Sequence, residues 1–470
     1  MKQTTILIGL TAALLSACGQ TPAPSTPQTQ GLSDYAQHRA ALPGAAASTG
    51  PNAPRLNVQR ADGQRTDLDH SLPAGALQGQ SLEQLDKSVP IILVHGLGGW
   101  GDGELLGFNY WGGPGGTVAD LRSQGYTVYA ASLGPVISNW DRASELFAQI
   151  RGGCVDYGAA HSAAAGHRRT DPVKCYPGFY PQWDAAHPVN LIGHSMGGPT
   201  SLALVSLLDR GSPADAAGSN LFAGGRAGWV KSVMTISGAN SGSPATDQLV
   251  SALPLLKDLI LSAAALGGGT TTGNSLYDMD MGQWGLRRQA GESLNAYLTR
   301  AFQPNSPLWK SEDQAAFDLS VEGAYQQNAR LPRSEHTRYF SWASSDTYPG
   351  LLTGWHYPRP TMAAPLHITA FPYAWPLPPG LGNLRGTSAK GTVTYGPEWW
   401  ENDGLVPVYA QHAPLGQSSV AYTGQTTQPG QWYRLGKMEG YDHLDAAGLL
   451  TLRDFRQFYR DQAAFLSSLK

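Results

Sequence analysis

The chain has 470 residues, of which 41% are hydrophobic and 14% charged, with a formal net charge of -3. This length is enough for one large domain or two ordinary ones, and the near-neutral charge argues against nucleic acid as a partner. The 57 glycines and 33 prolines predict many turns and long loops, which argues against a helical bundle.

Residues 1–18 are predicted to be a lipoprotein signal peptide. Lys2 precedes an apolar run over 6–15, and LSACG at 15–19 looks like a bacterial lipobox, in which Cys18 is lipidated and becomes the mature N-terminus. The alternative is an ordinary cleavage site in which Cys18 is incidental. Lipidation would anchor an exported protein to a membrane face of the cell envelope, unless the protein is released and secreted.

The next segments do not predict a core. Residues 19–54 are rich in Pro, Thr, Gln and Ala and are predicted to be a flexible tether. Residues 55–88 are polar and mixed, and the sequence does not place them. One folded domain is expected over 89–470, and no later stretch is apolar enough to cross a membrane.

Short β-branched or aromatic runs within this domain predict five strands, at 89–94, 126–131, 189–193, 231–236 and 338–343. Helical patterns lie between some of them, at 142–150 and 197–208. This alternation predicts an α/β fold, a mostly parallel sheet with helices on both faces. Functional residues in such sheets follow the carboxyl ends of strands.

Glycine-rich loops follow the first and third predicted strands. HGLGGW at 95–100 follows the first, and GHSMG at 193–197 follows the third and precedes a helix. The second loop fits Gly-x-Ser-x-Gly, whose strained turn exposes a nucleophilic serine in the α/β-hydrolase fold, here Ser195. The backbone N–H groups of Leu97 and Met196 would then form the oxyanion hole. The alternative is that both loops are only structural turns.

A strongly apolar stretch over 248–266 follows the fourth strand and ends at three glycines. Its helix is expected to start at Pro254. Such a helix suits a lid, predicted at about 246–275, which would cover the site in water and turn toward lipid at an interface. A buried core helix is the alternative.

The partners of the serine are expected to follow it in the order acid, then histidine. Asp403 lies in ENDGLVP at 401–407, where an Asp-Gly turn lets the carboxylate project from a strand end. His443 lies in GYDHL at 440–444, in a loop before the last helix. Asp442 competes for the acid role, but sequence neighbours seldom face each other. We predict a triad of Ser195, Asp403 and His443.

Longer motifs in the same order extend the pattern from about residue 89 to the C-terminus. They are FNYWGG at 108–113, SNWDRA at 138–143, DYGAAH at 156–161, QWGLRRQ at 283–289, DLS at 318–320 and ENDG at 401–404. With these motifs the chain resembles the large zinc-containing bacterial true lipases of the thermoalkalophilic type. The resemblance implies the same triad.

The resemblance also implies a zinc site in an insertion at about 138–180. Its ligands would be Asp141, His161, His167 and Asp313, a set of four that describes a structural zinc site. The family carries a calcium site after the catalytic histidine as well. Here Asp445 is acidic but the positions around Leu450 are hydrophobic, so a hard oxygen ligand is missing and calcium is doubtful.

Cys154 and Cys175 bracket the two predicted histidine ligands and depart from the family pattern. In an exported protein they can form a disulfide that reinforces the insertion. Metal ligation by these cysteines is the alternative.

These observations predict a lipase that hydrolyses carboxylic esters of triacylglycerols through an acyl-enzyme. An esterase or polyester hydrolase on short-chain or polymeric esters is the nearest alternative. A non-catalytic lipoprotein that uses the fold for binding is a remote one, which the intact Ser, Asp and His argue against. Chain-length preference, activity on phospholipids and oligomeric state stay open.

Overall fold

Seven parallel strands form the central sheet of the chain. The computed structural model describes residues 72–470 except 74, 78, 105–107, 249–260, 262–277, 304, 373–379, 450 and 452–454. The strand order is β12-β13-β7-β6-β5-β1-β2, and every neighbouring pair is parallel. The strands are β1 Ile91–Val94, β2 Val128–Ala130, β5 Val189–His194, β6 Val230–Ile236, β7 Arg338–Ser345, β12 Ser419–Ala421 and β13 Trp432–Glu439.

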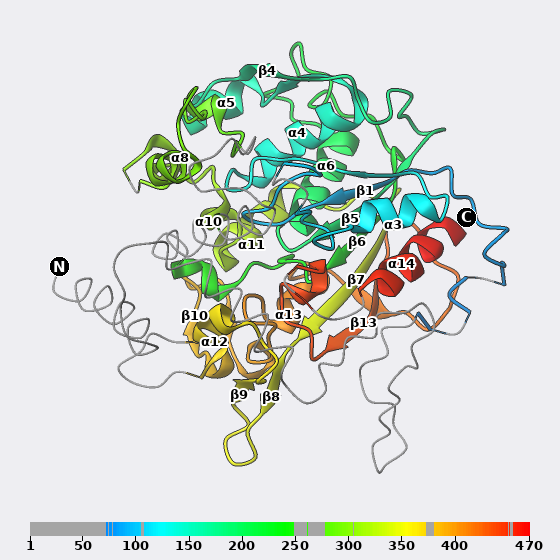
Figure 1. The fold of residues 1–470 in the computed structure, drawn as a ribbon, viewed down its shortest axis with the longest axis vertical. Coiled ribbons are helices and arrows are strands. Elements are labelled where there is room, and N and C mark those ends of the chain that lie inside the picture. Colours follow the sequence, from blue (N-terminus) through cyan, green and yellow to red (C-terminus); the bar gives the residue numbers. More distant parts are fainter. Residues whose placement is uncertain are drawn as a thin grey trace.

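Helices cover both faces of this sheet, as predicted (Figure 1). On one side lie α3 (Thr117–Ser123) and α14 (Arg456–Ser468), and on the other α4 (Asn139–Arg151) and α6 (Gly197–Arg210). Side chains of a strand alternate between the two cores: Ile91 packs in the first and Ile92 in the second. Two buried faces explain why a central strand such as β1, Ile91–Val94, is apolar at every position. The predicted α/β fold is therefore confirmed.

Two strands of the sheet, β12 and β13, lie outside the five predicted ones. In β13 charged and polar residues interrupt the apolar ones, and the β7–β13 register shifts between Arg434 and Gly436. A Cβ on Gly436 would meet the Trp342 ring at 2.6 Å, so the glycine makes room for a large buried side chain of β7. The alternation typical of a strand is lost at this shift.

Among the described residues, three antiparallel strand pairs lie outside the central sheet, and the shortest pairs β10 (Gly386–Thr387) with β11 (Thr394–Tyr395). The antiparallel pair β3 (Gly153–Asp156) and β4 (Thr170–Tyr176) lies after α4, with α5 (Ala159–Ala165) between its strands. It lies within the predicted insertion at 138–180, and a disulfide joins Cys154 to Cys175 across it. The third pair, a hairpin of β8 (Thr347–Pro349) and β9 (His356–Pro358), follows the carboxyl end of β7.

Several predicted features lie outside the described residues. These are the signal peptide, the tether, most of the lid at about 246–275, and Leu450 beside the doubtful calcium site. Within the described part, no helix is long and apolar enough to span a membrane.

Candidate active site

Ser195 occupies the sharp turn between β5 and α6. Its φ angle is 56°, in the left-handed region that non-glycine residues rarely adopt. A Cβ on Gly193 would collide with the backbone of Gly197, and one on Gly197 with the carbonyl of Val94. Both glycines are therefore required for the turn, which presents the serine hydroxyl at the start of α6.

His443 and Asp403 lie next to Ser195, although they are distant in sequence. His443 Nε2 is 2.8 Å from Ser195 Oγ, and His443 Nδ1 is 2.8 Å from Asp403 Oδ2. A carboxylate accepts only, so the Nδ1–H donates to Asp403 and leaves Nε2 to accept from the serine hydroxyl. The structure thus brings together the three predicted triad residues in the geometry of a nucleophile, a base and an orienting acid.

The Asp403 carboxylate is fully buried and hydrogen-bonded on both oxygens. Oδ1 accepts from the backbone N–H groups of Leu405 (3.0 Å) and Val406 (2.8 Å). Oδ2 also accepts from the Ser344 hydroxyl at 2.8 Å and the Gln411 amide at 3.2 Å. Four donors besides His443 therefore hold the carboxylate in one orientation. Sequence reasoning missed Ser344 and Gln411, which no local motif marks.

The competing acid Asp442 has other partners, and the two ring nitrogens of His443 lie against Asp403 and Ser195. Its Oδ2 accepts from the Ala363 backbone N–H at 2.7 Å, and its Oδ1 accepts from the backbone N–H groups of Leu444 and Asp445, each at 2.9 Å. Asp442 therefore shapes the loop that carries His443. Asp445 is buried, and its carboxylate accepts from the Asp442 backbone N–H at 3.3 Å.

The loop after β1 lies against Ser195. A Cβ on Gly96 would lie 2.6 Å from Ser195 Cβ, so the absence of a side chain lets the two loops approach. The backbone N–H groups of Leu97 and Met196 donate to no other described residue. They are thus available to a ligand oxygen at this junction, where an oxyanion hole is expected.

A buried chain of hydrogen bonds connects the loop after β1, the turn at Ser195 and the loop that carries His443. The Gly96 N–H donates to the Tyr110 hydroxyl oxygen at 3.0 Å, and that hydroxyl lies 2.6 Å from His194 Nδ1. His194 Nε2 lies 2.9 Å from the carbonyl oxygen of His443 and donates to it. Nδ1 is then an acceptor for the Tyr110 proton. Sequence reasoning missed both residues, although each lies inside a quoted motif.

Burial keeps this chain in one protonation state. Burial lowers the pKa of His194 well below its usual range, and the neighbouring His443 lowers it further. Burial raises the pKa of the Tyr110 hydroxyl. Both side chains are therefore neutral near pH 7, with the phenol as donor and the imidazole as donor and acceptor.

The second predicted group, Asp141, His161, His167 and Asp313, also converges. One ligand atom from each residue lies within 4.8 Å of the others. His161 Nε2 is 3.4 Å from Asp141 Oδ1 and 3.2 Å from Asp313 Oδ1. His167 Nε2 is 3.6 Å from Asp141 Oδ2 and 3.0 Å from Asp313 Oδ2. Neither cysteine belongs to this group. Cys154 and Cys175 are bonded to each other, which contradicts the alternative that they bind a metal ion.

The donor atoms of this group are oriented for a metal ion. Among the described residues, both histidine Nε2 atoms, Asp141 Oδ1 and Asp313 Oδ2 are buried and have no hydrogen-bond partner. His167 Nδ1 donates to the Arg168 carbonyl at 2.8 Å, which leaves its Nε2 as a lone-pair donor. Gln283 Nε2 donates to Asp141 Oδ2 at 3.0 Å, and the Trp140 ring stacks on His161 at 4.8 Å. Two nitrogens and two oxygens that lack partners fit a bound cation.

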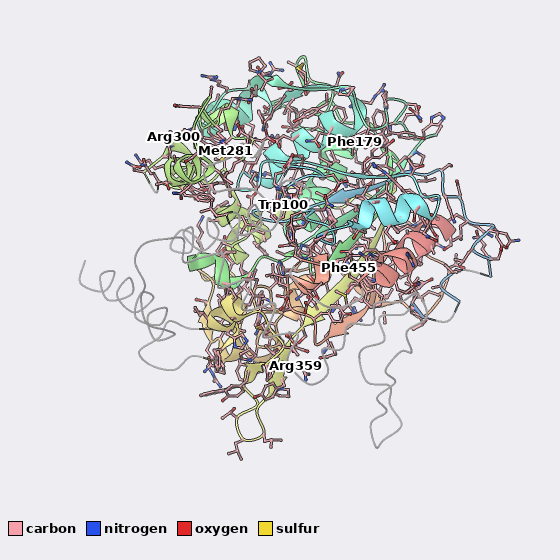
Figure 2. The ribbon with its side chains drawn as sticks, viewed as in Figure 1. Trp100, Phe179, Met281, Arg300, Arg359 and Phe455 are labelled. Atoms are coloured by element: carbon pink, nitrogen blue, oxygen red, sulfur yellow. A yellow bond between two sulfur atoms is a disulfide. The ribbon has the colours of Figure 1, made fainter. Side chains whose placement is uncertain are left out.

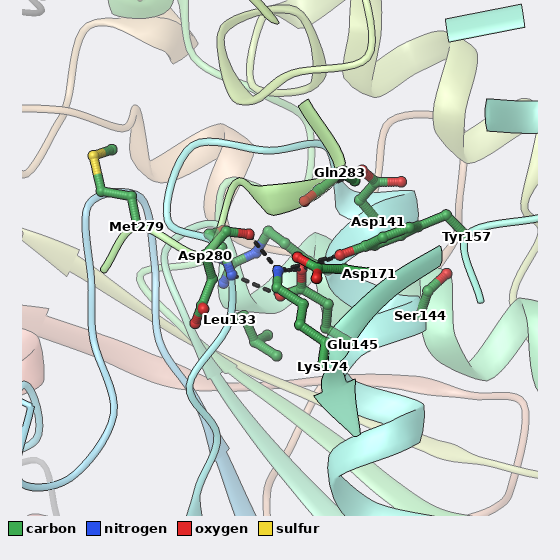
Figure 3. A network of polar contacts seen from close by, with 12 residues as sticks. Leu133, Asp141, Ser144, Glu145, Tyr157, Asp171, Lys174, Met279, Asp280 and Gln283 are labelled. Carbon is green, nitrogen blue, oxygen red and sulfur yellow. Dashed lines mark hydrogen bonds and ion pairs between the residues drawn. The ribbon is translucent and has the colours of Figure 1, made fainter. Parts of the chain in front are cut away.

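A buried ionic network connects the β3–β4 pair of the predicted insertion to the loop after β2 (Figure 3). The Lys174 ammonium on β4 forms an ion pair with Glu145 on α4, and the Tyr157 hydroxyl donates to the same carboxylate at 2.8 Å. Burial alone would lower the pKa of Lys174, but the Glu145 and Asp280 carboxylates outweigh it and raise that pKa. Glu145 also accepts from the Gly134 backbone N–H at 2.7 Å, in the loop after β2.

The family model described as "Lipase-like, C-terminal domain" matches residues 87–469. Lipase 1 of Staphylococcus aureus (strain MRSA252) is 35% identical over 386 residues, which cover 79% of this chain and 52% of that protein. The chain thus spans about half the length of the curated relatives it matches.

Two solved structures have similar folds. EstA from Clostridium botulinum superposes with a TM-score of 0.75 at 31% identity, covering 95% of this chain and 99% of that one. Lipase 1 from Pelosinus fermentans has a TM-score of 0.66 at 36% identity, covering 80% of this chain and 98% of that one.

Proposed function

The chain belongs to the family of the lipase-like, C-terminal domain, and from this membership and the geometry around Ser195 we propose that it is a lipase that hydrolyses carboxylic esters of triacylglycerols. The predicted resemblance to bacterial lipases is confirmed by the same matches. The observation that carries the proposal is the hydrogen-bonded series Ser195–His443–Asp403, with both contacts at 2.8 Å.

In the proposed reaction, Ser195 Oγ attacks the ester carbonyl while His443 Nε2 takes the hydroxyl proton. Asp403 stabilises the resulting imidazolium and holds its tautomer. The oxyanion of the tetrahedral intermediate accepts hydrogen bonds from the backbone N–H groups of Leu97 and Met196. His443 then gives its proton to the leaving alcohol, and an acyl-enzyme forms.

Water completes the cycle. His443 takes a proton from a water molecule that attacks the acyl carbonyl, and the second tetrahedral intermediate releases the fatty acid as His443 returns the proton to Ser195 Oγ. Asp403 keeps its orientation throughout, because its four additional donors hold both carboxylate oxygens.

We expect hydrolysis of p-nitrophenyl esters from acetate to palmitate to peak on the long chains, because a lipase binds an extended acyl group. Initial rates at equal concentration, with Ser195→Ala as the blank, measure the profile. Activity confined to the shortest chains would make the protein an esterase with the same mechanism. The absence of both activity and a fluorophosphonate adduct on Ser195 would favour a binding protein.

Tyr110→Phe is expected to lower kcat by roughly tenfold to a hundredfold, because it leaves the buried Gly96 N–H and His194 Nδ1 without a partner, at about 1–3 kcal/mol each. We expect the change in kcat and not in KM, because Gly96 and His194 position the loop after β1 and the backbone of His443. Tyr129→Phe, on strand β2 beside β1, is the control. A Tyr110→Phe enzyme with unchanged kcat would show that the chain does not position the site.

We propose Zn²⁺ as the ion of the Asp141, His161, His167 and Asp313 group. Two imidazole nitrogens and two carboxylate oxygens suit tetrahedral zinc, and four protein ligands leave no position open for substrate. The ion would therefore act as a structural cross-link between α4, the β3–β4 insertion and the segment around Asp313.

We also propose that the chain is exported and anchored through lipidated Cys18. The support is the lipobox-like sequence, together with the Cys154–Cys175 disulfide, a kind of bond that is common in oxidising compartments and rare in the cytosol. The mass of the mature N-terminal peptide tests the anchor, since lipidation adds acyl chains to Cys18.

A further inference from the structure

The β8–β9 hairpin ends in two leucines whose side chains are fully exposed. Leu351 and Leu352 are 104% and 100% exposed, the highest values among the described large hydrophobic residues. The hairpin projects beyond the neighbouring elements at the lower end of the molecule, below α12 (Ala364–Ala370) (Figure 1). A single exposed leucine is common on a protein surface, but an adjacent, fully exposed pair at a projecting tip is not.

The tip has a defined conformation. The strands pair Thr347 with Pro358 and Tyr348 with Tyr357, and the Gly350 N–H donates to the Trp355 carbonyl at 2.7 Å. The Gly354 N–H closes the turn on the Gly350 carbonyl at 2.9 Å. The leucines are therefore held outward by an ordered turn.

The hairpin carries no formal charge from 347 to 358. Its one histidine, His356, is neutral near pH 7, because burial lowers its pKa. The charged groups lie at the base, where Arg359 contacts Glu439 at 3.6 Å and Lys437 contacts Glu401 at 2.5 Å; Figure 2 marks Arg359 there. An apolar phase could take up the tip without desolvating an ion.

The base of the hairpin is bonded to the loop of the proposed catalytic acid. The Asp346 N–H and the Thr347 hydroxyl both donate to the Asn402 carbonyl at 3.2 Å, one residue before Asp403. The hairpin leaves the carboxyl end of β7, the same edge of the sheet at which β5 presents Ser195. A surface held by the tip therefore lies at the edge that carries the triad.

A second exposed apolar site adjoins the hairpin. On and just after α12, Ile368 and Phe371 are exposed, while Leu366 and Ala370 are buried beside Leu405. The outer face of α12 is thus apolar next to β9, which it contacts.

We propose that the β8–β9 tip, through Leu351 and Leu352, inserts into the surface of emulsified triacylglycerol and holds the enzyme there. This inference rests on the proposed function. A specific protein partner would need a complementary interface of about 1,200 Å² or more, which two leucines on a narrow projection do not provide. A fluid lipid surface deforms around such a tip and needs no matching shape.

The test compares adsorption of the full chain to a triolein emulsion, in a Ser195→Ala background so that the emulsion is not consumed. Leu351→Ser with Leu352→Ser should lower the partition coefficient by roughly tenfold to a hundredfold. Leu82→Ser with Val173→Ser is the matched control, because these residues are 58% and 61% exposed elsewhere on the protein, and it should adsorb like the parent. Leu351→Phe with Leu352→Phe, which keeps the tip apolar, should adsorb as strongly as the parent.

The parent's adsorption should persist in about 1 M salt, since no charge lies in the tip. Equal adsorption of the serine variant and the control would overturn the proposal. So would adsorption of the parent that salt abolishes, or a loss of self-association in the serine variant without a loss of adsorption.

Turnover separates this inference from the proposed function. With Ser195 restored, the serine variant should hydrolyse water-soluble p-nitrophenyl butyrate at the parental rate and triolein emulsion more slowly. A chain that adsorbs through the tip but cleaves no ester contradicts the proposed function alone. An active enzyme whose adsorption ignores the leucines contradicts the tip alone.

Discussion

Ser195→Ala is expected to lower kcat for ester hydrolysis by about five to six orders of magnitude, while the protein stays folded. The reason is that Ser195 Oγ is the proposed nucleophile, and the other residues of the proposed triad offer no atom that could replace it. His443 Nε2 would face a methyl group in the variant instead of the hydroxyl now at 2.8 Å. The residual rate would reflect binding and the oxyanion donors alone. Steady-state hydrolysis of p-nitrophenyl esters measures the loss, and the melting temperature checks the fold.

Ser206→Ala provides a matched control on the same helix. Ser206 is buried on α6, and its hydroxyl has no hydrogen-bond partner among the described residues. Removing that hydroxyl should leave both kcat and stability nearly unchanged. If the Ser195 variant kept more than about a hundredth of the parental kcat, the acyl-enzyme mechanism would be wrong.

The three residues of the proposed triad could be selected from the sequence because each follows a strand or turn that the local sequence marks. The apolar run at 189–193 and the glycines around Ser195 define the nucleophile turn, and the Asp-Gly turn at Asp403 presents a carboxylate. Strand-end placement in a parallel sheet then brings these residues to one edge. The two 2.8 Å contacts agree with that expectation.

The supporting residues could not be predicted, because their roles depend on contacts between distant segments. Tyr110 meets His194 across 84 positions, and Ser344 meets Asp403 across 59. No periodicity marks such pairs. The strand β13 was missed for a related reason: its polar residues and Gly436 make sense only against Trp342 of the neighbouring strand.

Helix α4 links the two sites of the molecule. Asp141 belongs to the group proposed to bind zinc. The next residue, Arg142, is fully buried and donates to the Gly134 carbonyl at 2.9 Å and to the His95 carbonyl. Its Nε donates to the Thr200 hydroxyl on α6 at 2.9 Å. The same helix therefore holds the ligand group, the loop expected to form the oxyanion hole and the helix that follows Ser195. A change in the group proposed to bind zinc should therefore lower the melting temperature more than it lowers kcat.

Asp141→Asn is accordingly expected to release the metal ion and lower the melting temperature by about 5 °C. The estimate takes a bound ion at a thousandfold excess over its Kd, which contributes about 4 kcal/mol. The amide removes a charged ligand from a group in which four buried donor atoms depend on an ion for a partner. Elemental analysis should fall from about one zinc per chain to almost none. Asp184→Asn, an exposed aspartate in a surface pair with His187, is the control and should change neither quantity.

Chelation with dipicolinate distinguishes a lost ion from a local packing defect. The parent should fall to the melting temperature of Asp141→Asn, and the variant should not respond, because both treatments remove the same ion. Additive effects of the substitution and the chelator would contradict the assignment, since they would mean that Asp141 stabilises the fold without binding metal. Activity on short esters at a temperature well below both transitions should change little, because no position of a four-ligand site is left for substrate. A large loss of activity at that temperature would instead mean that the ion also positions, through α4, the loop after β1 that is expected to form the oxyanion hole.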